Sequence, residues 1–291
     1  MSKKCLVIST LAAALLPWIL FSEPLHDNVN RLLSDVTSIF LAKNPDSLVA
    51  KTQSDLIEVK GGSFYFGKFD TQYGDQHYAD PSYSNTLPVK HISIEDFAIT
   101  KFQITYADYD IYTQVNDKVP IEITDTQQKE LKEPLIPVKL TWQEARDYCL
   151  WLGKVSGTQM DLPTEQQWEY AARSRGQFIL YPTDTGIVEP GRNVPLQIDK
   201  ERIRFSIGEY KLMPVGIFPP NALGIYDLAS NGLEWTRDKY NEPGYWENHE
   251  LYKDDIVVRS QIMLARGGAP TIYRFSDNKN NRNTARCVVS R

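Results

Sequence analysis

The middle of the chain carries two helix signals, and the long stretch after them carries no comparable pattern. Thr141 and Glu144 form a capping-box pattern at the start of the first helix, and the second helix is expected from Thr164 to Arg173. Beyond residue 177, glycine, proline and asparagine interrupt the apolar runs, so regular elements there must be short. The sequence also contains no internal repeat. This pattern excludes a coiled coil or a repeat protein and predicts one loop-rich α+β domain.

The segments before these helices predict short strands. They are expected at residues 57–62, 63–67, 89–94 and 97–104, with a further helix from Thr105 to Val115. Gly153 is expected to end the first of the two central helices. With 291 residues, 42% of them hydrophobic, the chain can bury a large core. Its net charge of −5 argues against a general nucleic-acid binder, which needs a basic surface.

The N-terminus predicts export. Lys3 and Lys4 precede an apolar run from Cys5 to Phe21, which is typical of a signal sequence. No clean cleavage site follows, so residues 1–22 are interpreted as either a signal peptide or an uncleaved signal anchor. Cys5 precedes the apolar run, which argues against a lipoprotein anchor. We expect a periplasmic location if the source is Gram-negative, with a membrane contact only through an uncleaved N-terminal segment.

Residues 23–54 are predicted to be a helical lead-in to the domain, which is expected to cover residues 55–291. Within the lead-in, apolar residues recur at helical spacing from Asn28 to Leu41, and the Asn44-Pro45 pair is expected to end that helix. The helix could pack on the main domain or act as a stalk. The apolar residues are Val29, Leu32, Leu33, Val36, Ile39 and Phe40.

Two cysteines lie beyond the signal segment, Cys149 and Cys287. An exported protein with two cysteines is a candidate for one disulfide, and a lone reactive thiol is the alternative.

Several segments, in order, resemble the formylglycine-generating enzyme (sulfatase-modifying factor) family. Residues 97–109 are similar to its opening pattern F-x-I-x-K-x-E-V-T-N-x-x-Y, and residues 161–173 to R-L-P-T-E-x-E-W-E-Y-A-A-R. Residues 137–153 resemble its first core helix, and residues 219–235 resemble P-P-N-x-x-G-L-Y-D-M-x-G-N-V-W-E-W. Residues 266–268 and 284–288 are similar to R-G-G-S and G-F-R-C-V. The resemblance implies a C-type-lectin-like α+β fold with short strands and two main helices.

The resemblance also bears on the cysteines. The family's oxidase holds copper with two cysteines in the stretch after R-G-G-S, and residues 269–282 contain none. Cys149 and Cys287 fall on two other family positions, which form a structural disulfide in members that have both. No copper is therefore expected. Other family enzymes bind iron through histidines of an additional helical domain, and the four histidines here show no metal-ligand spacing. They are His26, His77, His91 and His249.

A structural calcium ion is implied by the same resemblance. Carried over by position, its ligands would be the Asp227 and Glu234 carboxylates and three backbone carbonyls. Those carbonyls belong to Leu228, Ser230 and Gly232. The alternative is that the two acidic residues only cap loops.

Other residue sets favour packing over chemistry. Four tryptophans fall at core positions of the resemblance: Trp142, Trp151, Trp168 and Trp235. Glu165 and Glu169 are spaced like an acid/base pair, but a role in capping and in anchoring loops, for example to Arg173, is favoured. A binding surface is expected beside the stretch that lacks cysteine, because arginine and tyrosine often anchor interfaces. Its residues are Arg266, Tyr273, Arg274, Asp277 and Arg282.

The sequence thus favours a non-catalytic binding module of this family, with another envelope or extracellular protein as partner, such as an immunity or accessory protein. The alternative is an oxidative maturation enzyme of the same family that uses a site without cysteine. Fold alone does not decide between them.

Overall fold

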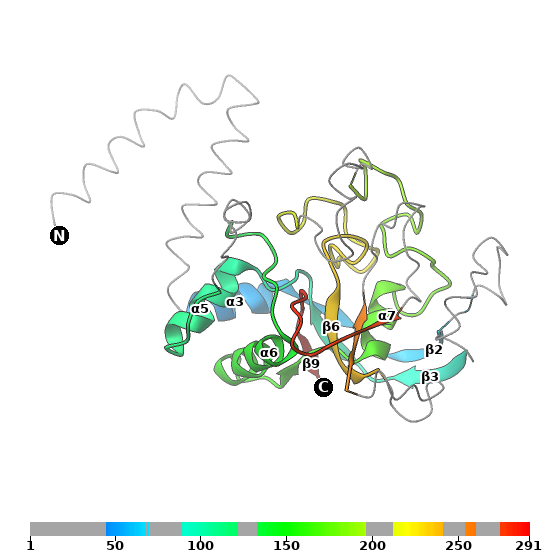
Figure 1. The fold of residues 1–291 in the computed structure, drawn as a ribbon. Coiled ribbons are helices and arrows are strands. Elements are labelled where there is room, and N and C mark those ends of the chain that lie inside the picture. The colour runs from blue at the N-terminus through cyan, green and yellow to red at the C-terminus, as the bar shows by residue number, and fades with distance from the viewer. Residues whose placement is uncertain are drawn as a thin grey trace, which may run out of the picture.

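A computed structural model of the chain describes residues 45–67, 69, 89–121, 133–195, 212–240, 254–259 and 274–291 (Figure 1). The predicted signal segment and the helix expected at residues 28–41 lie outside them. Among the helices of the described residues, none has both the length and the apolar character that crossing a membrane requires.

Four helices are described, and three begin at the caps that the sequence predicts. They are α3 (Pro45–Asp55), α5 (Tyr106–Val115), α6 (Trp142–Ser156) and α7 (Glu165–Ala172). Thr105, Thr141 and Thr164 each form a complete capping box with the residue three positions later. Pro45 occupies the first position of α3, where its missing N–H costs nothing. The helix that it was expected to end lies outside the described residues.

The predicted end of α6 at Gly153 is wrong. The helix continues to Ser156 and ends at Gly157, which has the left-handed backbone that favours glycine (φ 71°). Gly153 is needed for a different reason. A Cβ atom there would lie 2.7 Å from the backbone nitrogen of Met160, so glycine lets the β5 strand approach the helix.

A four-stranded antiparallel sheet has the order β1-β4-β9-β5. Its strands are β1 (Leu56–Val59), β4 (Phe97–Thr100), β9 (Val288–Ser290) and β5 (Met160–Asp161). The C-terminal strand therefore lies inside the sheet, between strands from distant parts of the chain. The predicted strand over residues 97–104 is shorter than expected, since residues 101–104 lead into α5.

Two smaller sheets complete the described fold. One is the hairpin of β2 (Gly62–Phe66) and β3 (Lys90–Ile94), and the other has the order β6-β7-β8. These three strands are β6 (Glu234–Lys239), β7 (Ile256–Arg259) and β8 (Arg274–Asp277). Figure 1 shows α3 and α5 at one end of the domain and the β2–β3 hairpin at the other, with β6 between them.

The four-stranded sheet separates two apolar clusters. Ala98 contributes to the cluster that contains α5, α6 and Trp235, whereas Phe97 and Ile99 contribute to the cluster around Trp168. Successive side chains of a strand point to opposite faces of its sheet, which explains this division. Buried side chains on both faces account for the uninterrupted burial of β4 from Phe97 to Ile99.

Candidate functional site

Cys149 on α6 and Cys287, one residue before β9, form a disulfide with Cα atoms 5.6 Å apart. Both residues are buried. The predicted pairing is therefore confirmed. The chain has three cysteines, and the third, Cys5, lies in the predicted signal segment. The domain consequently has no free thiol to bind a soft metal such as cuprous copper.

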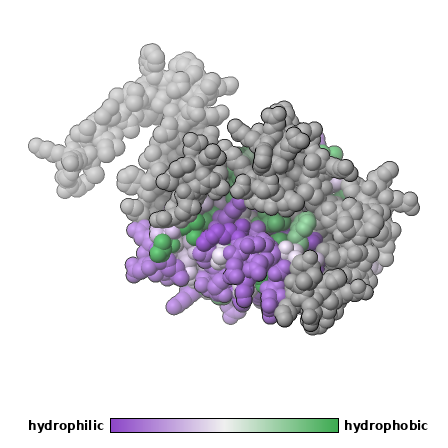
Figure 2. Space-filling model, in the orientation of Figure 1, coloured by the Kyte–Doolittle hydropathy of each residue, from purple (hydrophilic) through white to green (hydrophobic). Residues whose placement is uncertain are grey.

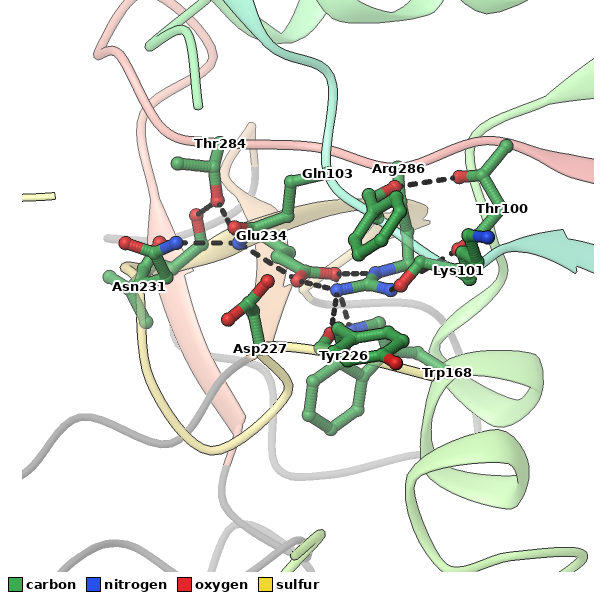
Figure 3. Close-up of polar contacts among 12 residues, drawn as sticks. Thr100, Lys101, Gln103, Trp168, Tyr226, Asp227, Asn231, Glu234, Thr284 and Arg286 are labelled. Atoms are coloured by element: carbon green, nitrogen blue, oxygen red, sulfur yellow. Dashed lines mark hydrogen bonds and ion pairs between the residues drawn. The ribbon is translucent and has the colours of Figure 1, made fainter. Parts of the chain in front are cut away.

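The Glu234 carboxylate is buried within a network of polar side chains (Figure 3). Arg286 donates to both of its oxygens, with Nε and Nη2 each 2.7 Å away. Trp168 Nε1 donates to Oε2 at 2.8 Å, and Gln103 Nε2 donates to Oε1 at 3.0 Å. Each oxygen therefore accepts two hydrogen bonds, which is the full capacity of an ionised carboxylate.

Arg286 carries this network into the surrounding backbone. Its guanidinium also donates to the carbonyls of Thr100 and Lys101 at 3.2 Å and to the carbonyl of Tyr226 at 2.9 Å. Arg286 and Glu234 are fully buried. A buried ion pair that is satisfied in this way fixes the positions of its elements, and it leaves no charge available for a substrate. The Arg286–Glu234 ion pair thus links three parts of the chain: the end of β4, the strand β6 and the segment before β9.

Two residues in left-handed backbone conformation shape the loop before β6. Asp227 (φ 63°) accepts a hydrogen bond from the Gly216 N–H at 2.9 Å. Asn231 (φ 70°) bonds to both the N–H and the carbonyl of Met213, at 2.8 and 2.9 Å. Burial raises the pKa of Asp227 to about 6, the nearby Glu234 adds to the shift, and the bond from Gly216 opposes it.

The Glu234 carboxylate does not fit the calcium role that the resemblance implies. All four of its acceptor positions are occupied by Arg286, Trp168 and Gln103. Among the described residues, no group of three or more acidic, histidine or cysteine side chains could hold a metal ion. Calcium prefers six to eight oxygen ligands, so the remaining predicted set, Asp227 and the three carbonyls, is small. Calcium at this turn stays a prediction.

A second buried ion network joins α7 to β7 and β8. Arg259 bridges Glu165 at 2.7 Å and Glu169 at 2.8 Å. Arg274 pairs with Glu165 at 2.8 Å, and Arg173 pairs with Glu169 at 2.8 Å. Both glutamates are almost inaccessible, with 2% and 0% of their surface exposed. They are structural anchors in this arrangement, since a general acid or base must reach a substrate.

The sequence anticipates part of this network. The predicted anchoring of Glu169 to Arg173 is confirmed. The partners from β7 and β8 were missed, although one signal exists. Arg259 ends the apolar run Ile256 to Val258, and an arginine in such a run needs a buried acidic partner.

The structure treats the five residues of the predicted binding surface differently. Arg266 and Tyr273 lie outside the described residues. Arg274 is 2% exposed and paired with Glu165, so in this conformation it cannot contact a partner, and the prediction is corrected for this residue.

The other two members of the set are more accessible. Asp277 lies at the far end of β8, where its carboxylate accepts from the Asn283 amide at 2.6 Å. Arg282 is exposed and pairs with Glu144 at the start of α6, 3.0 Å away. Asp277 and Arg282 are thus the described residues of this set that a partner could contact.

The tryptophans pack as predicted. Trp168 and Trp235 are buried, and Trp142 and Trp151 pack against the first apolar cluster. The Trp235 indole donates to the Leu140 carbonyl at 2.8 Å, as buried tryptophans usually require.

Comparison with known proteins decides the family. The Sulfatase-modifying factor enzyme 1-like domain matches residues 42–289. The chain belongs to the FGE-sulfatase family. Inactive C-alpha-formylglycine-generating enzyme 2 of Bos taurus is 25% identical over 229 residues, which cover 64% of this chain and 71% of that protein. Formylglycine-generating enzyme of Bos taurus is 32% identical over 130 residues, which cover 43% of this chain and 32% of the relative.

Another relative places the domain in a larger protein. Serine/threonine-protein kinase Pkn1 of Chlamydia trachomatis is 25% identical over 253 residues. The match covers 81% of this chain but only 35% of the kinase. The chain therefore spans about a third of the length of this relative.

Solved structures show the same fold. PvdO from Pseudomonas aeruginosa aligns with a TM-score of 0.54 and 22% identity, over 81% of this chain and 94% of PvdO. CarF aligns with a TM-score of 0.53 and 16% identity, over 81% and 98%. These likenesses confirm the predicted loop-rich α+β fold of the formylglycine-generating enzyme type.

Proposed function

We propose that this chain is a non-catalytic member of the FGE-sulfatase family, exported to the cell envelope, where it binds another protein. An immunity protein or an accessory protein of an envelope complex would have this role. One observation carries the proposal. The stretch that holds the copper-binding cysteines in the oxidases contains none here, and both cysteines of the domain are joined in a buried disulfide.

The buried carboxylates support a non-catalytic role. Glu165, Glu169 and Glu234 all lie in closed ion pairs with arginines. The relative that is named inactive adds to this support, because its similarity covers 64% of this chain. Oxidative chemistry would need a metal or cofactor site built from other residues.

The disulfide and the N-terminal pattern support export. Disulfides persist in oxidising compartments such as the periplasm and are rare in the cytosol. The basic start and the apolar run up to Phe21 provide the matching signal. The partner would contact the predicted surface around Arg266, Tyr273, Asp277 and Arg282, where arginine and tyrosine are favourable anchors.

The test is a purification from the native envelope. The chain is expressed with its own N-terminal segment and a C-terminal tag, and co-purifying proteins and bound metals are identified together. We expect one stoichiometric protein partner and no copper. A protein that carries copper or iron and has no partner would overturn the proposal in favour of a maturation enzyme.

Substitutions on the predicted surface test where the partner binds. Arg282→Ala combined with Tyr273→Ala should reduce recovery of the partner at least tenfold, because hot-spot anchors carry most of the binding energy. Arg192→Ala is the matched control, since Arg192 is a partly exposed arginine paired with Asp184 in a different loop. Equal recovery from both variants would exclude the predicted surface.

A further inference from the structure

The short helix α3 forms one wall of a cavity beside the Cys149–Cys287 disulfide. The cavity has a volume of about 20 Å³, and Cys287 lines it together with Tyr148 and Leu152 of α6. The connection between β4 and α5 forms a further wall. The α3 residues that line the cavity are Lys51, Thr52 and Asp55. A cavity of this size admits about one water molecule, so no thiol reagent fits while α3 is in place.

Few apolar contacts hold α3 on the domain. Its buried residues are Leu48, Thr52 and Asp55, of which Leu48 is the apolar one. Leu48 packs into the apolar cluster that contains both cysteines. Figure 2 shows a mostly hydrophilic surface at the end of the domain where Figure 1 places α3, α5 and α6. Because a helix of 11 residues is marginal without packing, α3 depends on these few contacts.

Ion pairs add to the attachment of α3. Lys51 lies 3.2 Å from Asp108 on α5, and Lys101 lies 2.8 Å from Asp55. The Lys101 N–H also donates to the Asp55 carbonyl at 2.8 Å, and β1 follows Asp55 directly. The C-terminal end of α3 is therefore fixed to the sheet, whereas Leu48 and Lys51 hold the part nearer the N-terminus. Ion pairs of partly exposed lysines contribute little to stability.

Opening of α3 would remove one wall of the cavity. An element with few buried apolar contacts can open locally while the rest of the domain stays folded. In the closed arrangement Cys149 and Cys287 are 0% and 1% exposed. Since thiol–disulfide exchange requires access to a sulfur atom, the position of α3 decides whether a reductant reaches the bond.

We propose that α3 is a strap that controls reduction of the Cys149–Cys287 disulfide by dithiols. When α3 opens about its C-terminal end, a thiolate of the dithiol attacks one sulfur atom and the S–S bond breaks. The second thiol of the reagent then displaces the mixed disulfide. Cys149 and Cys287 become thiols, and the dithiol becomes a disulfide.

The reduction has a structural consequence. It releases the link between α6 and the segment that leads into β9, the strand inside the four-stranded sheet. Anything that displaces α3 would thereby make this link reducible. The inference does not depend on whether the domain binds a partner.

Reduction of the folded chain by dithiothreitol tests the strap. The full chain is purified in detergent, and maleimide labelling of Cys149 and Cys287 is followed by mass spectrometry. Leu48→Asp removes the apolar anchor and should accelerate reduction at least tenfold, because the rate follows the population of the open state. Lys51→Ala removes the ion pair with Asp108 and should accelerate reduction about two- to fivefold. An unchanged rate in both variants would overturn the proposal.

Two controls separate opening of α3 from unfolding of the whole domain. Ile225→Ala leaves a cavity in the cluster around Trp168, on the other face of the four-stranded sheet, so it should lower global stability and leave the reduction rate unchanged. Lys60→Ala, at an exposed ion pair with Asp96, is the matched control for Lys51 and should also leave the rate unchanged. If Ile225→Ala accelerates reduction as strongly as Leu48→Asp, reduction follows global unfolding and the strap is excluded.

Hydrogen exchange of the native chain provides a second measurement, which stays available if Leu48→Asp fails to fold. The backbone amides of α3 should exchange at least tenfold faster than those in the middle of α6, because α3 opens locally. Equal protection of the two helices would contradict the proposal.

Discussion

The fold changes the protonation of Asp227, and this change can be tested by measuring stability against pH. Burial raises its pKa from the usual 3.8 to about 6. The folded chain then holds this proton more tightly than the unfolded chain, so the free energy of unfolding falls as the pH rises from about 4 to about 6. A pKa shift of this size lowers the free energy of unfolding by about 3 kcal/mol above this pH range.

Asp227→Asn should remove this pH dependence. The amide oxygen can still accept the bond from the Gly216 N–H, and asparagine tolerates the left-handed backbone at this position. In calcium-free buffer, urea unfolding should show the variant to be more stable than the native chain at pH 7 and equally stable near pH 4. Asp184→Asn, at an exposed ion pair, is the control. A variant that is less stable at pH 7 would contradict the expectation.

Calcium bound at the Asp227 turn would have the opposite effect on stability at pH 7, because it would favour the native chain over Asp227→Asn. A bound cation stabilises the ionised carboxylate, so calcium would raise the melting temperature of the native chain and leave that of Asp227→Asn unchanged. Calorimetry with calcium and with a chelator distinguishes the two situations. The absence of a calcium effect on the native chain would remove the predicted ion.

At the scale of single elements, the starts of three helices were predictable and most partners in the ion networks were not. The three capping boxes are local patterns of four residues, so the sequence alone locates the starts of α5, α6 and α7. The end of α6 at the left-handed Gly157 was missed because the sequence offers a second glycine, Gly153, four residues earlier, and only the contact with β5 explains that one. The partners of Glu234 lie 52 to 131 positions away along the chain, so only the assembled fold brings them together.

The connection between β4 and α5 provides a test of this network. Gln103 donates to Glu234 at 3.0 Å, whereas the related family pattern has glutamate at the corresponding position. Gln103→Glu would place a second carboxylate beside Glu234, with only Arg286 to balance both charges. We expect a loss of about 2–4 kcal/mol at pH 7 in urea unfolding, which shrinks at lower pH as the added carboxyl is protonated.

The control for this variant is Gln159→Glu, at an exposed position, which should change stability by less than about 0.5 kcal/mol. If Gln103→Glu is as stable as the native chain at pH 7, the expectation fails. Such a result would indicate that a cation balances the additional charge.

At the scale of the whole molecule, the Cys149–Cys287 disulfide closes a loop with a sequence separation of 138. A crosslink across so long a loop restricts the unfolded chain strongly, and the chain-entropy estimate for about 100 residues is already near 5 kcal/mol. Measured effects of native disulfides are usually about 2–5 kcal/mol. The bond also holds α6 to the segment that leads into β9, the strand inside the four-stranded sheet.

Replacing both cysteines by alanine should therefore lower the free energy of unfolding by about 2–5 kcal/mol, measured by urea unfolding at pH 7. Part of the loss comes from the chain entropy and part from the two buried sulfur atoms, so the reduced native chain is measured alongside the variant. Cys5→Ala, outside the domain, should have no effect. If the reduced chain is as stable as the oxidised chain, the disulfide does not stabilise the domain. The link between oxidative export and folding, on which the proposed location depends, would then lose its physical basis.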